Sequence, residues 1–338
     1  MKLLPILSII LLVIACTPKD ADNAITQTER DEIVNVTDKI TEVDLDSLML
    51  GMSHLHLLDS FLIVAENKAL NSEVIHIFNK NTFNYITSTG VLGRGPGEIS
   101  RIGNLSIDEQ RKIIWVPDHG KEVLFKFPLD SILNNPSFLP TEKLKLDPSL
   151  FITNFSFLND SIALGLGIEP TSNNTFNMAT VKLNVVNNTT EKFGFEFNEL
   201  EKIRFNFAMS KSKNRYVKCF RNVDLITICD LEGNLIRNVF GPNWGKKFKP
   251  RHSFFSGVEI TDTNIIAAYI GDESIVFDES NTPKGNIPTK LMFFDLEGNY
   301  QKTIETGSKV WSFCIDNENN RVICFFNDRL NPIGYFSL

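Results

Sequence analysis

The chain has 338 residues, of which 22% are charged and 42% hydrophobic, and its formal net charge is −7 at pH 7. This balance leaves no basic stripe, which argues against nucleic acid as a partner and is typical of a well-solvated surface. After the first 16 residues, no segment is long and apolar enough to span a bilayer, so we expect the rest of the chain to be in water.

The first 16 residues have the pattern of a secretion signal. Lys2 precedes an apolar run over residues 3–14, which is shorter than the roughly 20 residues that a membrane-spanning helix needs. The run ends in Val-Ile-Ala-Cys, which resembles the bacterial lipobox, where a small residue precedes the cysteine that is lipidated. We therefore expect residues 1–16 to be a lipoprotein signal and Cys16 to be acylated, which would hold the protein on a membrane. The alternative is an ordinary secretion signal that ends in cysteine.

Residues 17–31 are polar and unpatterned, which predicts a flexible tether between the lipid and the domain. Thr17 stands where an aspartate would favour retention in the inner membrane. We therefore expect a cell-envelope protein anchored to the outer membrane, on its periplasmic face or at the cell surface.

A pattern of alternating polar and apolar residues, an acidic turn and a second apolar strand recurs six times in residues 32–338. Its clearest copy runs from Asn104 through Asp108 to Val116. All six turns, at residues 59, 108, 160, 214, 262 and 316, fall 48 to 54 residues apart. Strand-type units at such a period are the signature of β-propeller blades. We therefore predict an all-β fold, a six-bladed β-propeller.

Each blade is expected to have four strands, because a second hairpin follows the repeated pattern in most copies. The predicted hairpins pair residues 74–79 with 83–88, 178–184 with 189–195, 225–230 with 235–240, and 291–295 with 300–305. The outer strand of blade two is expected within residues 141–146. Because no stretch carries a 3.6-residue period between good caps, we expect no helix longer than two turns.

The last copy of the repeat is incomplete, because residues 334–338 leave room for only a third strand. Residues 33–36 and 40–45 are short strand candidates that precede the first copy. Since an open ring would leave sheet edges unpaired, we predict that residues 32–45 supply the outer strand of blade six. The polar insertion at residues 271–289 is expected to be a long exposed loop in blade five.

The segment at residues 89–99, Thr-Gly-Val-Leu-Gly-Arg-Gly-Pro-Gly-Glu-Ile, leads into the acidic turn of blade two. It resembles the TolB-like six-bladed propeller lipoproteins of Gram-negative gut-type bacteria, in which Gly-Arg-Gly-Pro-Gly-Glu precedes an NHL-type repeat. The resemblance is most specific at residues 93–116 and implies a six-bladed propeller, a lipid anchor and no established catalytic residues. Blade four departs from the pattern, because its turn at residues 211–214 has no aspartate.

Two interpretations of residues 93–98 remain open. In one, the amides of Gly93, Gly95 and Gly97 form a nest for an anion, with Arg94 as the counter-charge. In the other, the glycines and the intervening proline bend the chain where it crosses from blade one to blade two. The segment matches neither a phosphate loop nor a dinucleotide fingerprint, and it lies between the outer strand of blade one and the inner strand of blade two, so we favour the crossover.

Four cysteines fall in apolar strands, Cys219 and Cys229 in blade four and Cys314 and Cys324 in blade six. An oxidising compartment permits disulfides, but a register change of one residue puts two thiols on opposite faces of a sheet. We expect buried free cysteines, and no structural zinc, since no zinc-type spacing occurs.

The inner strand of each blade should line the central channel, with residues two apart on the same face. Most of these positions are polar, and they include Ala208, Gly257, Ser312 and Cys314. One interpretation is a water-filled channel; the other is a small polar ligand or metal held by His54, His56 and Glu259. The candidate ligand-binding residues are His54, His56, Asn104, Ser106, Asn154, Ser156, Asn206 and Glu259.

Two classes of function remain open. The first is a non-catalytic binding or scaffold module that takes a glycan, a peptide or a partner protein; for it we expect a monomer without a cofactor. The second is a metal-dependent propeller hydrolase or lyase with its metal in the channel. The sequence favours the first class, because it contains no hydrolase motif and its inner strands offer few carboxylates.

Overall fold

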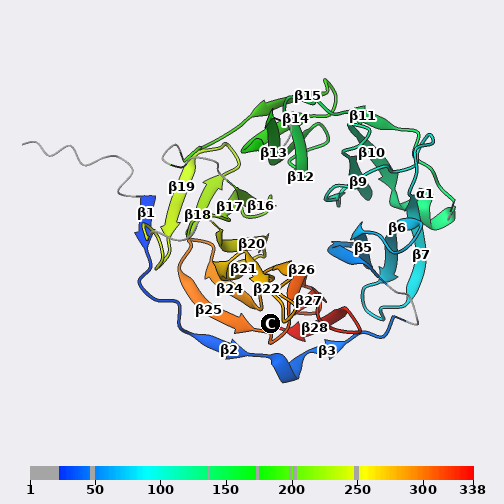
Figure 1. The fold of residues 1–338 in the computed structure, drawn as a ribbon. Coiled ribbons are helices and arrows are strands. Elements are labelled where there is room, and N and C mark those ends of the chain that lie inside the picture. Colours follow the sequence, from blue (N-terminus) through cyan, green and yellow to red (C-terminus); the bar gives the residue numbers. More distant parts are fainter. Residues whose placement is uncertain are drawn as a thin grey trace, which may run out of the picture.

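The computed structural model describes residues 23–45, 50–135, 137–172, 175–197, 200, 204–246 and 251–338. Six sheets are arranged radially around a central channel, so the predicted all-β six-bladed propeller is confirmed (Figure 1). The α-helix found in these residues, α1 (Leu129–Asn134), has only six residues, as expected. A 3₁₀ turn, η2, covers Thr37–Lys39. None of the helices described is long and apolar enough to cross a membrane.

Each of the first three blades is a sheet of four strands that follow one another in the chain. Blade one has β4 (Met52–Leu58), β5 (Phe61–Lys68), β6 (Glu73–Asn79) and β7 (Tyr85–Val91). Blade two has β8 (Ser106–Asp108), β9 (Ile113–Asp118), β10 (Val123–Pro128) and β11 (Lys143–Lys145). Blade three has β12 (Phe151–Phe157), β13 (Ile162–Ser172), β14 (Thr175–Asn184) and β15 (Thr189–Lys192). The outer strand of blade two therefore falls within the predicted range.

The last three blades each gain a strand from the N-terminal end of the chain. Blade four has β16 (Phe205–Ser210), β17 (Arg215–Phe220), β18 (Leu225–Asp230) and β19 (Leu235–Phe240). Blade five has β20 (His252–Ile260), β21 (Asn264–Glu273), β24 (Lys290–Asp295) and β25 (Tyr300–Glu305). Blade six has β26 (Val310–Asp316), β27 (Arg321–Phe326) and β28 (Ile333–Ser337). The four hairpins predicted from the sequence are present, with shifts of a few residues at their ends.

Six apolar clusters hold the ring together, one between each pair of adjacent blades. Between blades one and two, for example, Ile63 and Ile77 pack with Ile114 and Phe125. A middle strand therefore buries both of its faces, and all six residues of β27 are buried. Burial on both faces explains why these strands are nearly continuous apolar runs in the sequence.

The N-terminal belt, residues 23–45, runs along the outside of blades four, five and six (Figure 1). β3 (Thr41–Glu42) pairs antiparallel with β28 and completes blade six, which confirms the predicted closure for these two residues. β2 (Ile33–Asn35), which we expected to help blade six, instead pairs parallel with β25 as a fifth strand of blade five. It satisfies the outer edge of β25, because the amide of Thr303 donates to the carbonyl oxygen of Glu32.

The expected flexible tether is corrected in its C-terminal part. β1 (Ala24–Thr26) pairs parallel with β19 as a fifth strand of blade four. Arg30 then fixes the chain, because its Nη1 lies 2.7 Å from Oδ1 of the buried Asp224 and its guanidinium lies over the ring of Phe294. Backbone pairing and a buried ion pair thus hold residues that looked unpatterned in the sequence. Residues 1–22, which include Cys16, lie outside the described residues.

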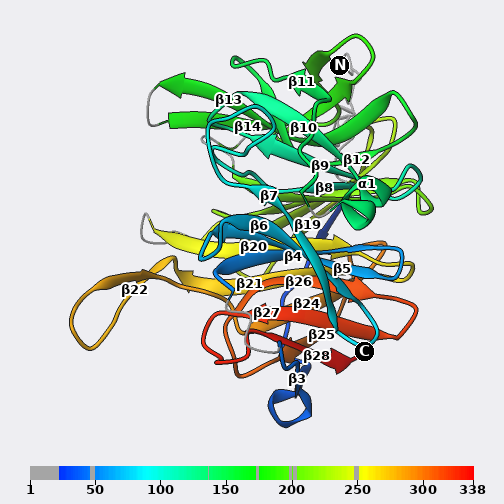
Figure 2. The same cartoon turned by 90° about the vertical axis from the view of Figure 1, so that its right-hand side faces the viewer.

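The insertion in blade five is also more ordered than expected. β22 (Ile275–Phe277) and β23 (Pro283–Gly285) form a two-stranded antiparallel ribbon that projects from the ring (Figure 2). The ribbon turn is closed by Asp278, which accepts a hydrogen bond from the amide of Thr282 and pairs with Lys284. The prediction of an exposed loop is therefore correct for its position and exposure but wrong for its structure.

The four cysteines of the ring are free and buried. Cys219 and Cys229 belong to different apolar clusters, on opposite sides of blade four. Cys314 and Cys324 are divided in the same way between the two sides of blade six. This is the arrangement expected from the sequence, and the register places each pair of thiols on opposite faces of its sheet.

Candidate functional site

The loop at residues 93–98 supplies its own anion. The amide of Gly95 donates to the Glu98 carboxylate over 2.6 Å, and a side chain at Gly93 would collide with that carboxylate. Lys121 then ties the loop to blade two, because its ammonium donates to the carbonyl oxygens of Gly95 and Glu98. The structure therefore favours the crossover interpretation over an anion site at Gly93, Arg94, Gly95 and Gly97.

Several polar residues of the inner strands link neighbouring blades. The Asn154 side chain of blade three donates to the carbonyl oxygen of Phe207 in blade four over 3.1 Å. Asn206 makes the same link one blade further, to the carbonyl oxygen of Phe255 over 3.1 Å. Each amide nitrogen uses one of its two N–H donors in this way, so these two predicted ligand-binding residues link the blades as well as line the channel.

Serines make the corresponding links elsewhere in the ring. Ser106 of blade two accepts a hydrogen bond from the amide of Phe155 over 2.9 Å. Ser312 of blade six accepts from the amide of Leu55 and donates to the carbonyl oxygen of Ser53, both over 3.1 Å, which joins the last blade to the first. The sequence pattern correctly placed these residues in the ring, but it could not show that a neighbouring backbone would use them.

The channel holds two neighbouring cavities that share part of their walls. The larger, of about 280 Å³, opens toward the turns that join the inner strands to their neighbours, and the smaller has a volume of about 140 Å³. His56, Asn154 and Glu259 line both cavities. Ser156 lines the larger, while His54 and Asn104 line the smaller. All eight candidate ligand-binding residues named from the sequence therefore line one or both of these cavities.

The two channel histidines are neutral. Burial lowers the pKa of His54 to about 4. Burial, with the nearby His54 as a second cause, lowers the pKa of His56 to about 3. Nε2 of His56 is shielded from solvent and has no hydrogen-bond partner among the described residues. A neutral imidazole with an unpartnered nitrogen can accept or donate a hydrogen bond, depending on its tautomer.

Glu259 is the only carboxylate that an inner strand directs into the channel among the residues described. Burial raises the pKa of its carboxyl to about 7, and no described residue pairs with it. At the corresponding position, blades four and six carry Ala208 and Cys314, so the ring does not need a charged residue there. A carboxyl group that loses hydration without gaining a partner destabilises the fold, which is typical of a functional site.

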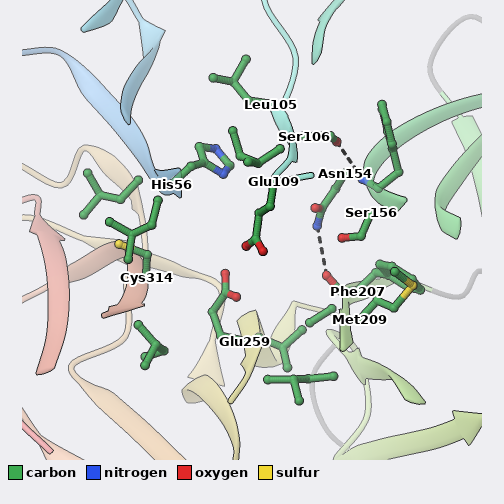
Figure 3. Close-up of a pocket in the computed structure, with 18 of the residues that line it drawn as sticks. His56, Leu105, Ser106, Glu109, Asn154, Ser156, Phe207, Met209, Glu259 and Cys314 are labelled. Atoms are coloured by element: carbon green, nitrogen blue, oxygen red, sulfur yellow. Dashed lines mark hydrogen bonds between the residues drawn. The ribbon is translucent and has the colours of Figure 1, made fainter. Parts of the chain in front are cut away.

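A second carboxylate, from Glu109, points toward Glu259 from the other side of the cavity (Figure 3). Glu109 lies in the turn between β8 and β9 of blade two, whereas Glu259 lies on β20 of blade five, which is the opposite blade of the ring. Sequence reasoning missed Glu109 because it considered only the inner strands. Its position in the repeat could have identified it. Glu109 lies two residues after Ile107, and Asn317, at the same distance after Ile315 in blade six, lines the cavity too.

Aliphatic side chains surround these polar groups at the mouth of the channel. Five blades contribute one half-buried residue each to the wall of the larger cavity, and we call this set the apolar collar: Leu57, Ile107, Met209, Ile260 and Ile315. In the sequence, each collar residue directly follows a channel-facing residue. The collar is therefore set by the same alternation of polar and apolar residues along the inner strands.

The arrangement does not resemble a metal centre. No three His, Cys, Asp or Glu side chains come together as potential metal ligands in the part of the chain that the structure describes. The predicted sharing of one metal by His54, His56 and Glu259 is therefore not supported. Alternate residues of one strand and a residue from a distant blade face the same channel without converging on one point.

Comparison with known proteins supports the architecture. A family model, DUF5128, described as a 6-bladed beta-propeller, matches residues 26–158, which cover β2, β3, the first two blades and the inner strand of blade three, β12. No curated protein sequence is similar enough to count as a match. The six-bladed propeller expected from the resemblance is thus found both in the structure and in the matching family.

Solved structures share the fold at low sequence identity. A member of the duf4221 family from Bacteroides vulgatus is 9% identical, with a TM-score of 0.60 over 88% of this chain and 96% of that one. A putative exported protein from Bacteroides fragilis is 12% identical, with a TM-score of 0.54 over 93% and 98%. A luciferin-regenerating enzyme is 9% identical, with a TM-score of 0.51 over 85% and 91%. Such identities show the fold alone.

Proposed function

We propose that this protein is a lipid-anchored, non-catalytic binding module of the bacterial cell envelope, and that its ligand enters the central channel. The observation that carries the proposal is the pair of unpaired carboxylates, Glu109 and Glu259, beside the unpartnered His56 in a cavity of about 280 Å³. A fold without use for Glu259 would gain stability by replacing it, since Ala208 and Cys314 occupy the equivalent position in blades four and six.

The lipid anchor is supported by the N-terminal sequence. The charged start, short apolar core and Ala15-Cys16 pair are the parts of a lipoprotein signal. The likeness of residues 93–116 to TolB-like NHL-type propeller lipoproteins points the same way, and an exported Bacteroides protein shares the fold. The outer membrane is the proposed location, and a glycan, peptide or protein partner outside the channel belongs to the same proposal.

Palmitate labelling of cells tests the anchor. The wild-type protein should incorporate label and fractionate with outer membranes, whereas Cys16→Ala should be unlabelled. Equal labelling of both proteins would overturn the proposed lipidation, and fractionation with the inner membrane would overturn the proposed location.

A plug in the channel tests the binding site. Ala208 lines the larger cavity, so Ala208→Phe should fill it while leaving the ring folded. A panel of small amines, sugars and short peptides is screened by thermal shift against both proteins. A ligand that stabilises the wild type should have no effect on the plugged variant. If the plugged variant responds as the wild type does, the channel is not the site.

The enzymatic alternative, a metal-dependent hydrolase or lyase, finds no ligand cluster in the described residues. Metal analysis of the purified protein distinguishes the two functions. Calcium or zinc at one equivalent per chain, lost in Glu259→Gln, would replace the binding-module proposal with the enzymatic one.

A further inference from the structure

We propose that the mouth of the channel binds the primary ammonium group of a small organic cation. This inference rests on the proposed function, because it names the ligand class for the same cavity. Three features of the larger cavity lead to it: the sign of its charge, the kind of hydrogen bond it lacks, and the apolar collar around it.

A carboxyl group stands on each side of the mouth, and the one from Glu259, whose pKa burial raises to about 7, is negative above that pH. Glu109 and Glu259 point toward each other from opposite blades (Figure 3), and neither is paired with another described residue. Among the residues with a described position, no lysine or arginine lines either of the two channel cavities. Lys211 is near, but it lines an adjoining hollow that shares Glu109 with the mouth. Walls of one sign raise the local concentration of a ligand of the opposite sign, so the cavity selects a cation.

The polar groups of the cavity that lack hydrogen-bond partners would be satisfied by a ligand with several N–H or O–H donors. Carboxylates only accept hydrogen bonds, and neutral His56 accepts at Nε2 when its proton is on Nδ1. Nε2 of His56 is unpartnered within the described part of the chain but is shielded from solvent, so it can bind a ligand only if the ring turns. A primary ammonium has three N–H donors, which matches these three acceptors. A quaternary ammonium carries the same charge but offers no donor.

The remainder of the ligand would lie against the apolar collar. Its five aliphatic side chains are half-buried and form only a small part of a mostly polar cavity wall, so they offer an alkyl chain a limited apolar contact. A volume of about 280 Å³ is at the lower limit of ordinary ligand pockets, which restricts the ligand to a small molecule. A bare divalent metal fits poorly, because the described residues contain no group of three converging ligands.

The test uses three probes with the same alkyl body and different head groups: n-pentylammonium, pentyltrimethylammonium and 1-pentanol. Calorimetry on the full mature protein should show the tightest binding for n-pentylammonium. Because charge-assisted hydrogen bonds distinguish it, we expect about tenfold weaker binding of each of the other two probes. Trp311 lines the smaller cavity and gives a second readout by fluorescence.

Single substitutions test whether n-pentylammonium binds at the mouth of the channel. Glu109→Gln and Glu259→Gln should each weaken n-pentylammonium binding by about tenfold and leave 1-pentanol unchanged. Lys211→Met removes a nearby positive charge and should tighten n-pentylammonium binding by about twofold. Glu279→Gln, at an exposed position on the blade-five ribbon, is the control and should change nothing.

Each contrary result has its own meaning. If 1-pentanol binds as tightly as n-pentylammonium and both are lost in the Ala208→Phe variant, the channel is a binding site but the ammonium inference is overturned. If n-pentylammonium does not bind, or binds equally well to both glutamine variants, the inference is also overturned. If neither the three probes nor the wider panel binds the channel, the proposed function itself fails.

Discussion

Glu259 makes the stability of the protein depend on pH in an unusual direction. Its pKa is raised to about 7, so the unfolded chain releases this proton near its ordinary pKa while the folded chain retains it. The fold therefore loses stability between about pH 4.5 and pH 7 because of Glu259. A shift of this size corresponds to about 3 kcal/mol, and solvent in the channel should reduce the effect to about 1–2 kcal/mol.

Glu259→Gln removes that ionisation. Chemical denaturation should show the variant to be more stable than the wild type by about 1–2 kcal/mol at pH 8 and equally stable at pH 4. Glu279→Gln serves as the control and should match the wild type at both values. A variant that is less stable than the wild type at pH 8 would contradict the argument.

The channel histidines make the fold less stable at low pH, whereas Glu259 makes it less stable at high pH. Their pKa values are lowered to about 4 for His54 and about 3 for His56, so below pH 6.5 only the unfolded chain gains these protons. Stability should therefore fall as the pH decreases from 6.5 toward 4, by about 1–2 kcal/mol for each histidine at pH 4.5. Denaturation of a His54→Asn/His56→Asn double variant should show a shallower dependence over this window; an unchanged slope would contradict the prediction.

The roles of individual residues could be predicted from the sequence only in part. Alternation along the inner strands identified His56 and Glu259, because a strand has a period of two. The same rule named Asn154 and Asn206 as ligand residues, although their amides bind the next blade. Glu109 was missed because it belongs to a turn, and the direction of a turn residue depends on the neighbouring blades rather than on local alternation.

Among the elements, the N-terminal belt depends on one buried ion pair. Arg30 and Asp224 are both almost completely buried, at 3% and 0% exposure of their side chains. Removal of one partner leaves the other charge buried, which typically costs about 3–5 kcal/mol. Arg30→Ala should therefore lower the free energy of unfolding by about 3 kcal/mol in denaturant titrations.

A double variant checks the cause of this loss. In Arg30→Ala/Asp224→Asn, the buried carboxylate is replaced by a neutral amide, so stability should recover in part relative to Arg30→Ala alone. Arg94→Ala, at an exposed position, should have little effect. If the double variant is no more stable than the single one, the ion pair is not the source of the stability.

Truncations separate the strands of the belt. A chain that begins at residue 32 lacks β1 and Arg30 but retains β2 and β3, and it should melt cooperatively at a lower temperature. A chain that begins at residue 50 also lacks the strand that completes blade six, and it should fail to unfold cooperatively because the edge of β28 is left open. Circular dichroism melts provide the measurement. If the shorter chain melts like the mature protein, the belt does not close the ring.

The elements that sequence analysis described wrongly are those added at edges. β1 and β2 are three-residue strands that pair parallel with a distant partner, so they carry no periodic signal of their own. The blade-five ribbon was expected to be a loop because its strands are equally short and include a proline. The belt strands are held by long-range pairing that local propensity does not encode, whereas the ribbon is a local hairpin whose strands are too short to show a clear alternating pattern.

At the scale of the whole molecule, the period of the repeat was sufficient to predict the architecture. Six copies at near-even spacing predicted six blades, and incompleteness of the last copy predicted that the N-terminus returns to it. The candidate ligand site also exists only at this scale. Its two carboxylates belong to blades two and five, so they face each other only when the ring is closed.

The belt also determines when the protein can finish folding. Residues 24–42 leave the ribosome or a translocation pore well before their partners β19, β25 and β28, the last of which ends at Ser337. The belt must therefore wait until the chain has been made as far as β28 before all of it is paired. Contacts so distant in sequence slow folding, and they leave the ring open until β28 is present. During that interval, the segment and the waiting edges of three blades are accessible to chaperones and to proteases.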